Sequence, residues 1–238
     1  MGKLFITMPA YNEADNLQEV VQGWHTVCTE LNKQGVDANL VVANDGSKDN
    51  TWEVLLELQQ QYPRLVPISK TNSGHGATLM FLYKYAIDNK CDWVFQTDSD
   101  GQTLPDEFWQ MWENRDKAAF HIGVRSKRQD GRSRILVTRT LRFAVWLTFG
   151  VWVKDANTPF RLMRSDRLSE IMNMIPQDYF LANVAISALA IRRNESVEWY
   201  PVTFRPRQGG VNSINMKRIV KIGIEAVCSF PKIRRMSR

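Results

Sequence analysis

The order of apolar segments along the first half of the chain constrains the fold most strongly. Runs of strand length cover residues 4–8, 40–43, 65–69 and 92–96, and segments with helical spacing cover residues 13–33, 50–62 and 77–88 between them. A regular alternation of strand and helix is typical of a mostly parallel sheet covered by helices on both faces. We therefore predict an α/β fold whose ligands bind at the carboxyl ends of the strands.

Size and charge narrow the class of protein further. With 238 residues, of which 44% are hydrophobic and 24% charged, the chain can form one globular domain with at most a small appendage. A net charge of +6 favours an anionic partner such as a phosphorylated metabolite, a nucleic acid or a membrane surface. The three cysteines show no metal or redox spacing, and no cleavable leader precedes the first strand, so we expect a cytoplasmic protein.

An acidic segment follows the fourth predicted strand, at residues 97–102. Asp98 and Asp100 are separated by one residue, so both carboxylates can turn towards one point where the strand ends. Carboxylate oxygens suit Mg²⁺ or Mn²⁺ that keeps open positions for substrate phosphates, and Gln102 can add an amide oxygen. Taken alone, the segment is better explained as a turn, because Asp, Ser and Gly are turn formers.

Polar loops also follow the other three strands, at residues 9–13, 44–51 and 72–77. Each has an ordinary structural explanation as a turn or a helix cap. Tyr11 nevertheless offers a ring for stacking on a base, and Asn12 and Glu13 offer hydrogen-bonding groups. Gly74 and Gly76 permit close approach of phosphate to a helix N-terminus. The glycine motifs of dinucleotide-binding folds and of P-loops are both absent from the sequence.

Together, the four loops resemble a known family. The segments P-A-Y-N-E, N-D-G-S-x-D-x-T, N-S-G-H-G-A and D-S-D-G-Q, in this order, are similar to those of family 2 glycosyltransferases, and most of all to the dolichyl-phosphate mannose synthase-like and polyprenyl-phosphate glycosyltransferase branch. The resemblance extends over residues 4–213. It implies a GT-A (Rossmann-like) catalytic domain over residues 1–213, followed by a basic amphipathic C-terminal helix and tail over residues 214–238.

The resemblance also implies the residues of a donor site. The donor nucleotide is expected at Pro9, Tyr11, Asn12, Glu13, Ala43, Asp45, His75 and Ser99. Asp98, Asp100 and Gln102 are expected to hold Mg²⁺ or Mn²⁺, which would neutralise charge on the leaving nucleoside diphosphate. Asn44 stands where the family usually has Asp, so we expect base or ribose contacts that differ in detail.

The second half of the chain resembles the family's phosphate and acceptor segments. The basic loop at residues 123–134 is by itself a solvated loop, but the resemblance assigns Arg125 and Arg134 to phosphate binding and adds Arg125 to the catalytic residues Asp98 and Asp100. The segment at residues 155–161 resembles the family's D-x-x-(S/T)-G-F-R acceptor segment, with proline in place of the glycine. The expected acceptor contacts are Arg134, Asp155 and Arg161, and the expected phosphate contact of the last loop is Arg207.

The acceptor decides the mechanism, because a hydroxyl acceptor needs a general base and an ionised phosphate does not. Asp178 is the only acid before the helix that follows the acceptor segment, and it is equally well explained as an N-cap. We therefore favour a metal-dependent, inverting transfer from GDP-mannose or a UDP-hexose to polyprenyl or dolichyl phosphate. Transfer to a sugar hydroxyl, with Asp178 as base, is the alternative, and a non-catalytic scaffold that binds nucleotide-sugars is a further one.

The membrane is the other expected partner. The apolar run at residues 143–153 has about 11 residues, whereas a membrane span needs about 20. This run is equally well explained as a buried core helix and as a helix in a membrane interface. We expect peripheral attachment to the cytoplasmic face of a membrane. We expect no nucleic-acid binding, because the basic residues do not gather on one recognition helix. The sequence does not predict the oligomeric state.

Overall fold

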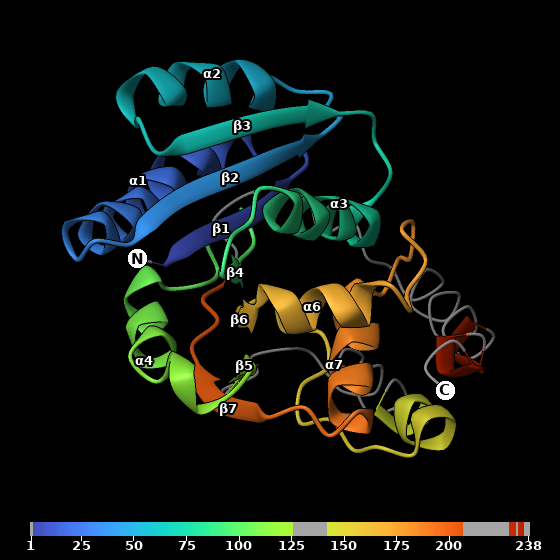
Figure 1. The fold of residues 1–238 in the computed structure, drawn as a ribbon. Coiled ribbons are helices and arrows are strands. Elements are labelled where there is room, and N and C mark those ends of the chain that lie inside the picture. The colour runs from blue at the N-terminus through green and yellow to red at the C-terminus, as the bar shows by residue number, and fades with distance from the viewer. Residues whose placement is uncertain (1, 126–141, 207–228, 232, 236–238) are drawn as a thin grey trace.

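The computed structural model describes residues 2–125, 142–206, 229–231 and 233–235. Over these residues the chain forms one sheet with helices on both faces (Figure 1). Its strands are β1 (Lys3–Ala10), β2 (Asp37–Asp45), β3 (Leu65–Lys70), β4 (Trp93–Gln96), β5 (Phe120–Arg125), β6 (Arg161–Arg164) and β7 (Val197–Val202). Its labelled α-helices are α1 (Ala14–Lys33), α2 (Thr51–Gln61), α3 (His75–Asp88), α4 (Phe108–Trp112), α6 (Ser165–Met172) and α7 (Ala182–Arg192), with short 3-10 turns at Pro105–Glu107 and Arg115–Lys117.

The predicted mostly parallel sheet is confirmed. The strand order is β3-β2-β1-β4-β6-β5-β7, and β1 pairs in parallel with both β2 and β4. β6 was not predicted from the sequence. It runs antiparallel between β4 and β5, so the segment that precedes it returns to the same edge of the sheet as the end of β4.

The sheet separates two hydrophobic cores, because successive strand residues face opposite sides. Leu4 and Ile6 pack with α1, α2 and α4, whereas Phe5 lies between them in sequence and packs with α3 and α7. Full burial of an apolar side chain of this size contributes about 1.5–3 kcal/mol. The strands are therefore fixed on both faces, and the loops at their ends are held by a rigid support.

An aromatic cluster lies directly below the end of β4. The ring of Phe95 is 4.8 Å from that of Phe160, 5.0 Å from that of Phe108 and 5.2 Å from that of Trp24, centroid to centroid. All four side chains are buried. Edge-to-face and tilted pairs of this kind stabilise beyond the area they bury. The acidic segment at residues 97–102 thus begins two residues after a buried ring that contacts three others.

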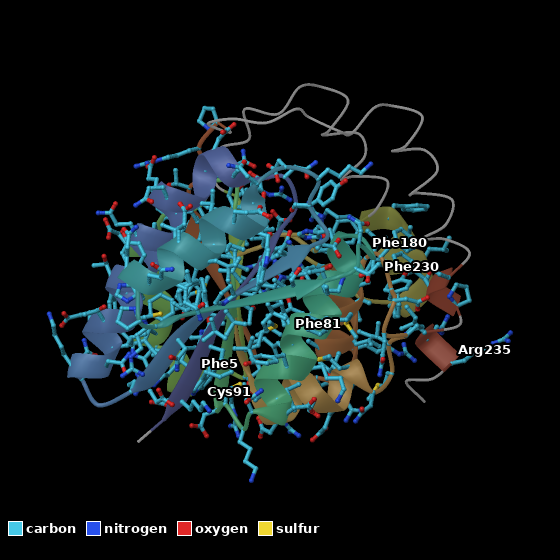
Figure 2. All side chains as sticks on the ribbon, turned by 90° about the horizontal axis from the view of Figure 1, so that it is seen from above. Phe5, Phe81, Cys91, Phe180, Phe230 and Arg235 are labelled. Atoms are coloured by element: carbon cyan, nitrogen blue, oxygen red, sulfur yellow. The ribbon has the colours of Figure 1, made fainter. Side chains whose placement is uncertain are left out.

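The C-terminal residues that the structure describes pack on the main core. Phe230 and Ile233 are buried, and the ring of Phe230 lies 5.3 Å from that of Phe149. Figure 2 shows Phe230 near Phe180 at one end of the molecule, with Arg235 projecting outwards. Residues 207–228, which include most of the expected amphipathic helix, lie outside the described residues.

The apolar run at residues 143–153 contributes a helix at residues 142–149 that has two apolar sides. Val145 and Phe149 are fully buried, whereas Phe143, Trp146 and Leu147 are 56%, 47% and 63% exposed. The buried side agrees with the explanation as a core helix, while the membrane interface stays a prediction for the exposed side. In the described part of the chain, no helix is both long and apolar enough to cross a membrane.

Candidate active site

The polar loops after β1, β2, β3 and β4 meet at one edge of the sheet, as predicted. The parallel register pairs Pro9 with Ala43, Asp45 with Lys70, and Thr7 with Gln96. These pairs stand at or near the carboxyl ends of their strands, where open α/β sheets bind ligands. The residues expected to bind the donor and the metal are thereby brought together.

The acidic segment forms a turn that is tied to β1. The buried Ser99 donates its hydroxyl hydrogen to the carbonyl oxygen of Pro9 at 2.9 Å. One carboxylate oxygen of Asp100 accepts the backbone N–H of Gln102 at 3.2 Å, and Gly101 has a φ of 70° that suits glycine. Ser99 therefore holds the turn in place, while the half-buried carboxylates of Asp98 and Asp100 lie on either side of it.

Gln102 connects this turn to the segment after β7. Its side-chain N–H₂ donates to the carbonyl oxygen of Arg205 at 2.8 Å, and its own carbonyl oxygen accepts the N–H of Arg205 at 2.9 Å. The amide nitrogen of the side chain is thus used for structure, and the amide oxygen is the atom that can serve a metal. Two carboxylates and an amide oxygen are hard ligands, so the residues present fit Mg²⁺ or Mn²⁺.

The loop after β1 is braced against the loop after β2. Asn12 has a φ of 54°; its side-chain oxygen accepts the N–H of Lys48 at 2.8 Å, and its own N–H donates to the hydroxyl of Ser47 at 3.0 Å. The buried Glu13 accepts from the side chain of Asn16 at 2.6 Å at the start of α1. These two side chains, expected to bind the donor, therefore shape the loop. Tyr11, which is 42% exposed, is available for stacking on a base.

Asp45 occupies the anion position that the glycine loop was expected to offer to phosphate. Its carboxylate accepts the backbone N–H groups of Ser73 and Gly74, each at 2.9 Å, and a hydrogen bond from Lys70. Burial alone would raise the pKa of Asp45, but the bonds from Lys70 and Ser73 outweigh burial and hold it below its usual range. The amides just before α3 thus bind a carboxylate of the chain itself.

Gly76 is required for packing. A Cβ placed there would stand 2.3 Å from the carbonyl oxygen of Phe180 and 2.5 Å from that of Tyr179. The first turn of α3 therefore lies directly against the segment that precedes α7, and no larger residue fits. His75 is exposed beside it, at the first position of α3, where the predicted donor contact stays a prediction.

On the acceptor side, Arg125 and Asp155 bind each other. The guanidinium of Arg125 donates two hydrogen bonds to the Asp155 carboxylate, both 2.9 Å long, and lies 5.5 Å from the ring centre of Phe204. The Asp155 side chain is 3% exposed and that of Arg125 is 21% exposed. This bidentate ion pair joins the end of β5 to the expected acceptor segment. The partly exposed Arg125 is the member of the pair that can bind a phosphate.

Arg161 lies wholly inside the protein, where its guanidinium binds the chain itself, and its contact with an acceptor stays a prediction. Its guanidinium donates to the carbonyl oxygens of Ala156, Thr158 and Asn183 at 2.6, 2.6 and 3.0 Å. Burial lowers its pKa to about 10, which leaves it charged near neutral pH. Its hydrogen bonds to Ala156 and Thr158 therefore stabilise the conformation of the acceptor segment.

The remaining predicted site residues are Arg134, Arg207 and Asp178. Arg134 and Arg207 lie outside the described residues. Asp178 is exposed in the turn before α7, and the N-cap of α7 is Leu181, so the N-cap explanation of Asp178 was wrong. Sequence reasoning missed Lys70 as the partner of Asp45, although a lysine at the end of a strand beside an acidic loop is a usable signal.

The chain belongs to glycosyltransferase family 2. The sequence profile described as "Glycosyl transferase family 2" matches residues 5–173, which is well over half of the chain. The fold, the converging loops and this match together define the protein as a glycosyltransferase with a GT-A fold.

Two curated relatives align with nearly the whole chain. The undecaprenyl-phosphate 4-deoxy-4-formamido-L-arabinose transferase of Edwardsiella ictaluri is 25% identical over 225 residues, which are 93% of this chain and 66% of the relative. The polyprenol monophosphomannose synthase of Mycolicibacterium smegmatis is 23% identical over 227 residues, covering 91% of this chain and 83% of the relative. The chain thus spans a little under two thirds of the first relative and more of the second.

Solved structures show the same fold. Glucosyl-3-phosphoglycerate synthase from Mycobacterium tuberculosis, in complex with Mn²⁺, UDP and glucosyl-3-phosphoglycerate, aligns with a TM-score of 0.69 and 16% identity over 96% of this chain and 80% of that chain. TarS 1–349 of S. aureus aligns with a TM-score of 0.59 and 16% identity over 96% of this chain and 65% of that chain.

Proposed function

We propose that this glycosyltransferase moves a sugar from a nucleotide-sugar to a polyprenyl phosphate, with a divalent metal at Asp98 and Asp100. The observation that carries the proposal is the turn of Asp98 and Asp100, tied through Ser99 to the loop of Pro9 at the sheet edge where the other loops meet. The names of the two relatives support a lipid-phosphate acceptor, and the Mn²⁺ and UDP in the mycobacterial structure support the metal and the nucleotide.

In this proposal each described residue has a separate task. Tyr11 stacks on the base, and Asp98, Asp100 and the amide oxygen of Gln102 hold Mg²⁺ or Mn²⁺. When bound, the metal neutralises charge on the nucleoside diphosphate that leaves. Arg125, oriented by the buried Asp155, directs its guanidinium at a phosphate. The donor is GDP-mannose or a UDP-hexose in our proposal, and a panel of nucleotide-sugars distinguishes the two.

The acceptor is the finer question, and the position of Asp178 favours a phosphate. A hydroxyl acceptor needs a base that is held within hydrogen-bonding distance of it, whereas a phosphate monoester is already ionised. Asp178 is exposed in the turn before α7, so water surrounds the carboxylate that would have to act as the base. Transfer to a sugar hydroxyl, with Asp178 as base, is the second candidate because no other acid stands in the segment between Pro176 and Asn183.

The Asp178→Asn variant tests this choice. We expect its kcat with polyprenyl phosphate to stay within about twofold of the wild-type value, because a nucleophile that is already ionised gains little from a base. Initial rates with a panel of UDP- and GDP-sugars measure the effect. A loss of about 100-fold or more, the size expected for removal of a general base, would instead favour the hydroxyl acceptor.

We also propose that the chain works at the cytoplasmic surface of a membrane, through the exposed side of helix 142–149. The apolar patch consists of Phe143, Trp146 and Leu147 on this helix and of Trp152 just after it, and all four side chains are between 47% and 63% exposed. Cations stand beside it: the guanidinium of Arg142 lies 4.9 Å from the Trp152 ring, and Lys154 follows two residues later. Aromatic side chains with a basic rim suit the boundary between anionic headgroups and acyl chains.

The Trp146→Ser, Leu147→Ser double variant tests membrane binding. We expect its partition coefficient onto vesicles that contain phosphatidylglycerol to fall at least about tenfold, because losing the burial of a large apolar side chain costs about 1.5–3 kcal/mol. Sedimentation with vesicles measures the bound fraction. The matched control is Leu56→Ser on α2, where another large apolar side chain is 40% exposed. Equal binding by the double variant, the control and the wild type would contradict the proposal.

A further inference from the structure

A chain of buried polar side chains runs from the end of β4, through α3 and α7, to the start of β6. The hydroxyl of Tyr83 on α3 lies 2.8 Å from the side-chain oxygen of Gln96 and 3.1 Å from that of Asn183 on α7. The backbone carbonyl of Asn183 accepts a hydrogen bond from Arg161 at 3.0 Å, and Ser187 accepts a second one from the same guanidinium at 2.8 Å. All five side chains are at most 2% exposed. We call Gln96, Tyr83, Asn183 and Arg161 the buried polar chain.

The hydrogen bonds of this chain depend on the Tyr83 hydroxyl. A hydroxyl has one hydrogen to donate, so it can serve only one of the two amide oxygens and must accept from the other amide. The side-chain N–H₂ of Gln96 is buried and has no hydrogen-bond partner among the described residues. Flipping the Gln96 side-chain amide, so that its oxygen and nitrogen exchange places, would bring the N–H₂ group to the Tyr83 hydroxyl oxygen. Without the Tyr83 hydroxyl, the side-chain amides of Gln96 and Asn183 would each lose a hydrogen-bond partner.

The buried polar chain joins the two halves of the candidate active site. Gln96 is the last residue of β4, two positions before the metal-binding Asp98. At the other end, Arg161 holds the carbonyl of Ala156, next to Asp155, which orients Arg125. The charge of Asp98 contributes to the pKa values of both Tyr83 and Arg161, so this acid lies within electrostatic reach of the chain. Burial is the main influence on both groups, raising the pKa of Tyr83 and lowering that of Arg161.

We propose that Tyr83 is a positioning residue, whose hydroxyl sets the distance between the metal-binding turn and the acceptor segment through Gln96 and Asn183. The inference rests on the proposed function, which supplies the two groups that have to be placed. The β4–β6 ladder already pairs the backbones of Gln96 and Arg161, and the buried polar chain adds a side-chain link between the same two strand ends, through α3 and α7, which holds the segments beyond them. A misplacement of about 1 Å between reacting groups can lower a rate about 100-fold.

The Tyr83→Phe variant tests this role, with Tyr85→Phe as the matched control. Tyr85 lies on the same helix, is half-buried and stacks on Phe5 with ring centres 6.0 Å apart. We expect Tyr83→Phe to lower kcat about 10- to 100-fold and to leave the KM for the nucleotide-sugar within about twofold, because the loss is one of alignment. Tyr85→Phe should keep both constants within about twofold. Thermal unfolding of each variant shows that rates are compared between folded proteins.

Coupling to Asn183 separates positioning from ordinary packing. Asn183→Leu breaks the same Tyr83–Asn183 hydrogen bond from the other side, so we expect it to lower kcat similarly and the Tyr83→Phe, Asn183→Leu double variant to lower it little further. Additive losses, or a Tyr83→Phe variant with wild-type kcat, would overturn the inference. A wild-type protein that transfers no sugar would refute the proposed function. Amide hydrogen exchange then still tests Tyr83, because the backbone of residues 97–102 should exchange faster in Tyr83→Phe and at the wild-type rate in Tyr85→Phe, and equal exchange in the two variants would overturn the inference.

Discussion

The Asp100→Asn variant is expected to lose at least about 10³-fold in kcat while keeping the wild-type fold, because a metal supplies several kcal/mol of charge stabilisation in the transition state. Asparagine has the shape of aspartate, and its side-chain oxygen can still accept the N–H of Gln102 that Asp100 accepts at 3.2 Å. The substitution therefore removes the charge and leaves the turn. Circular dichroism and thermal unfolding check the fold, and initial rates at saturating Mn²⁺ measure the loss.

The matched control is Asp106→Asn. Asp106 lies in the 3-10 turn that follows the acidic segment, and it is exposed. The control makes the same chemical change a few residues from the site, so its kcat should stay within about twofold of the wild-type value. If Asp100→Asn retained full activity, Asp100 would not hold the metal and the assignment of the site would be wrong. If both variants lost activity equally, the loss would come from general charge and not from metal binding.

The Arg161→Met variant is expected to lose about 3–4 kcal/mol of the free energy of unfolding, since it removes four hydrogen bonds that a buried cation donates. Three backbone carbonyls and the Ser187 hydroxyl receive hydrogen bonds from this guanidinium, and Arg161 is fully buried. Methionine fills much of the volume of the aliphatic stem but donates nothing. Denaturation by urea, followed by tryptophan fluorescence, measures the free energy of unfolding.

Arg164→Met provides the comparison for this variant. Arg164 stands at the other end of β6, with a side chain that is 51% exposed and pairs with the equally exposed Asp166. Exposed ion pairs contribute little, so we expect a change below about 0.5 kcal/mol. Similar losses in the two variants would mean that β6 tolerates no substitution at either end. A negligible loss in Arg161→Met would contradict the structural role that burial assigns to it.

Much of the fold could be predicted from the sequence, because the strands near the N-terminus are apolar runs buried on both faces. The run at residues 40–43 marked the centre of β2, while the structure extends it to Asp37–Asp45 through polar ends that carry no hydrophobic signal. β6 was missed because it has four residues with arginine at both ends. Its pairing with β4 and β5 joins segments far apart in the chain, which local periodicity does not report.

The site was predicted in outline, but the roles of several residues needed the structure. Asn12 and Glu13 are polar side chains in a loop, so the sequence allowed them to face a ligand. Their hydrogen bonds run instead to Lys48 and Asn16. Arg161 looked like a ligand-binding cation because charged side chains are seldom fully buried without a carboxylate partner. The one sequence signal for its burial was its place between Phe160 and Leu162.

The buried polar chain shows most clearly why sequence reasoning stops short. Tyr83 and Asn183 lie 100 positions apart, in helices whose spacing predicts only that they are buried. A tyrosine in an apolar helical stripe is ordinary core material, and nothing local distinguishes it from Tyr85. Only the packing of α3 and α7 on the same face of the sheet brings the two side chains into contact.

The measurement that tests the central claim most directly compares two acceptors that differ in one group. The protein is incubated with Mn²⁺ and each sugar-labelled donor of the panel, together with either undecaprenyl phosphate or undecaprenol in the same detergent. The account predicts a labelled lipid product from the phosphate, none from the alcohol, and none from the phosphate with Asp100→Asn. Labelling of undecaprenol, or no labelling of undecaprenyl phosphate by any donor of the panel, would contradict it.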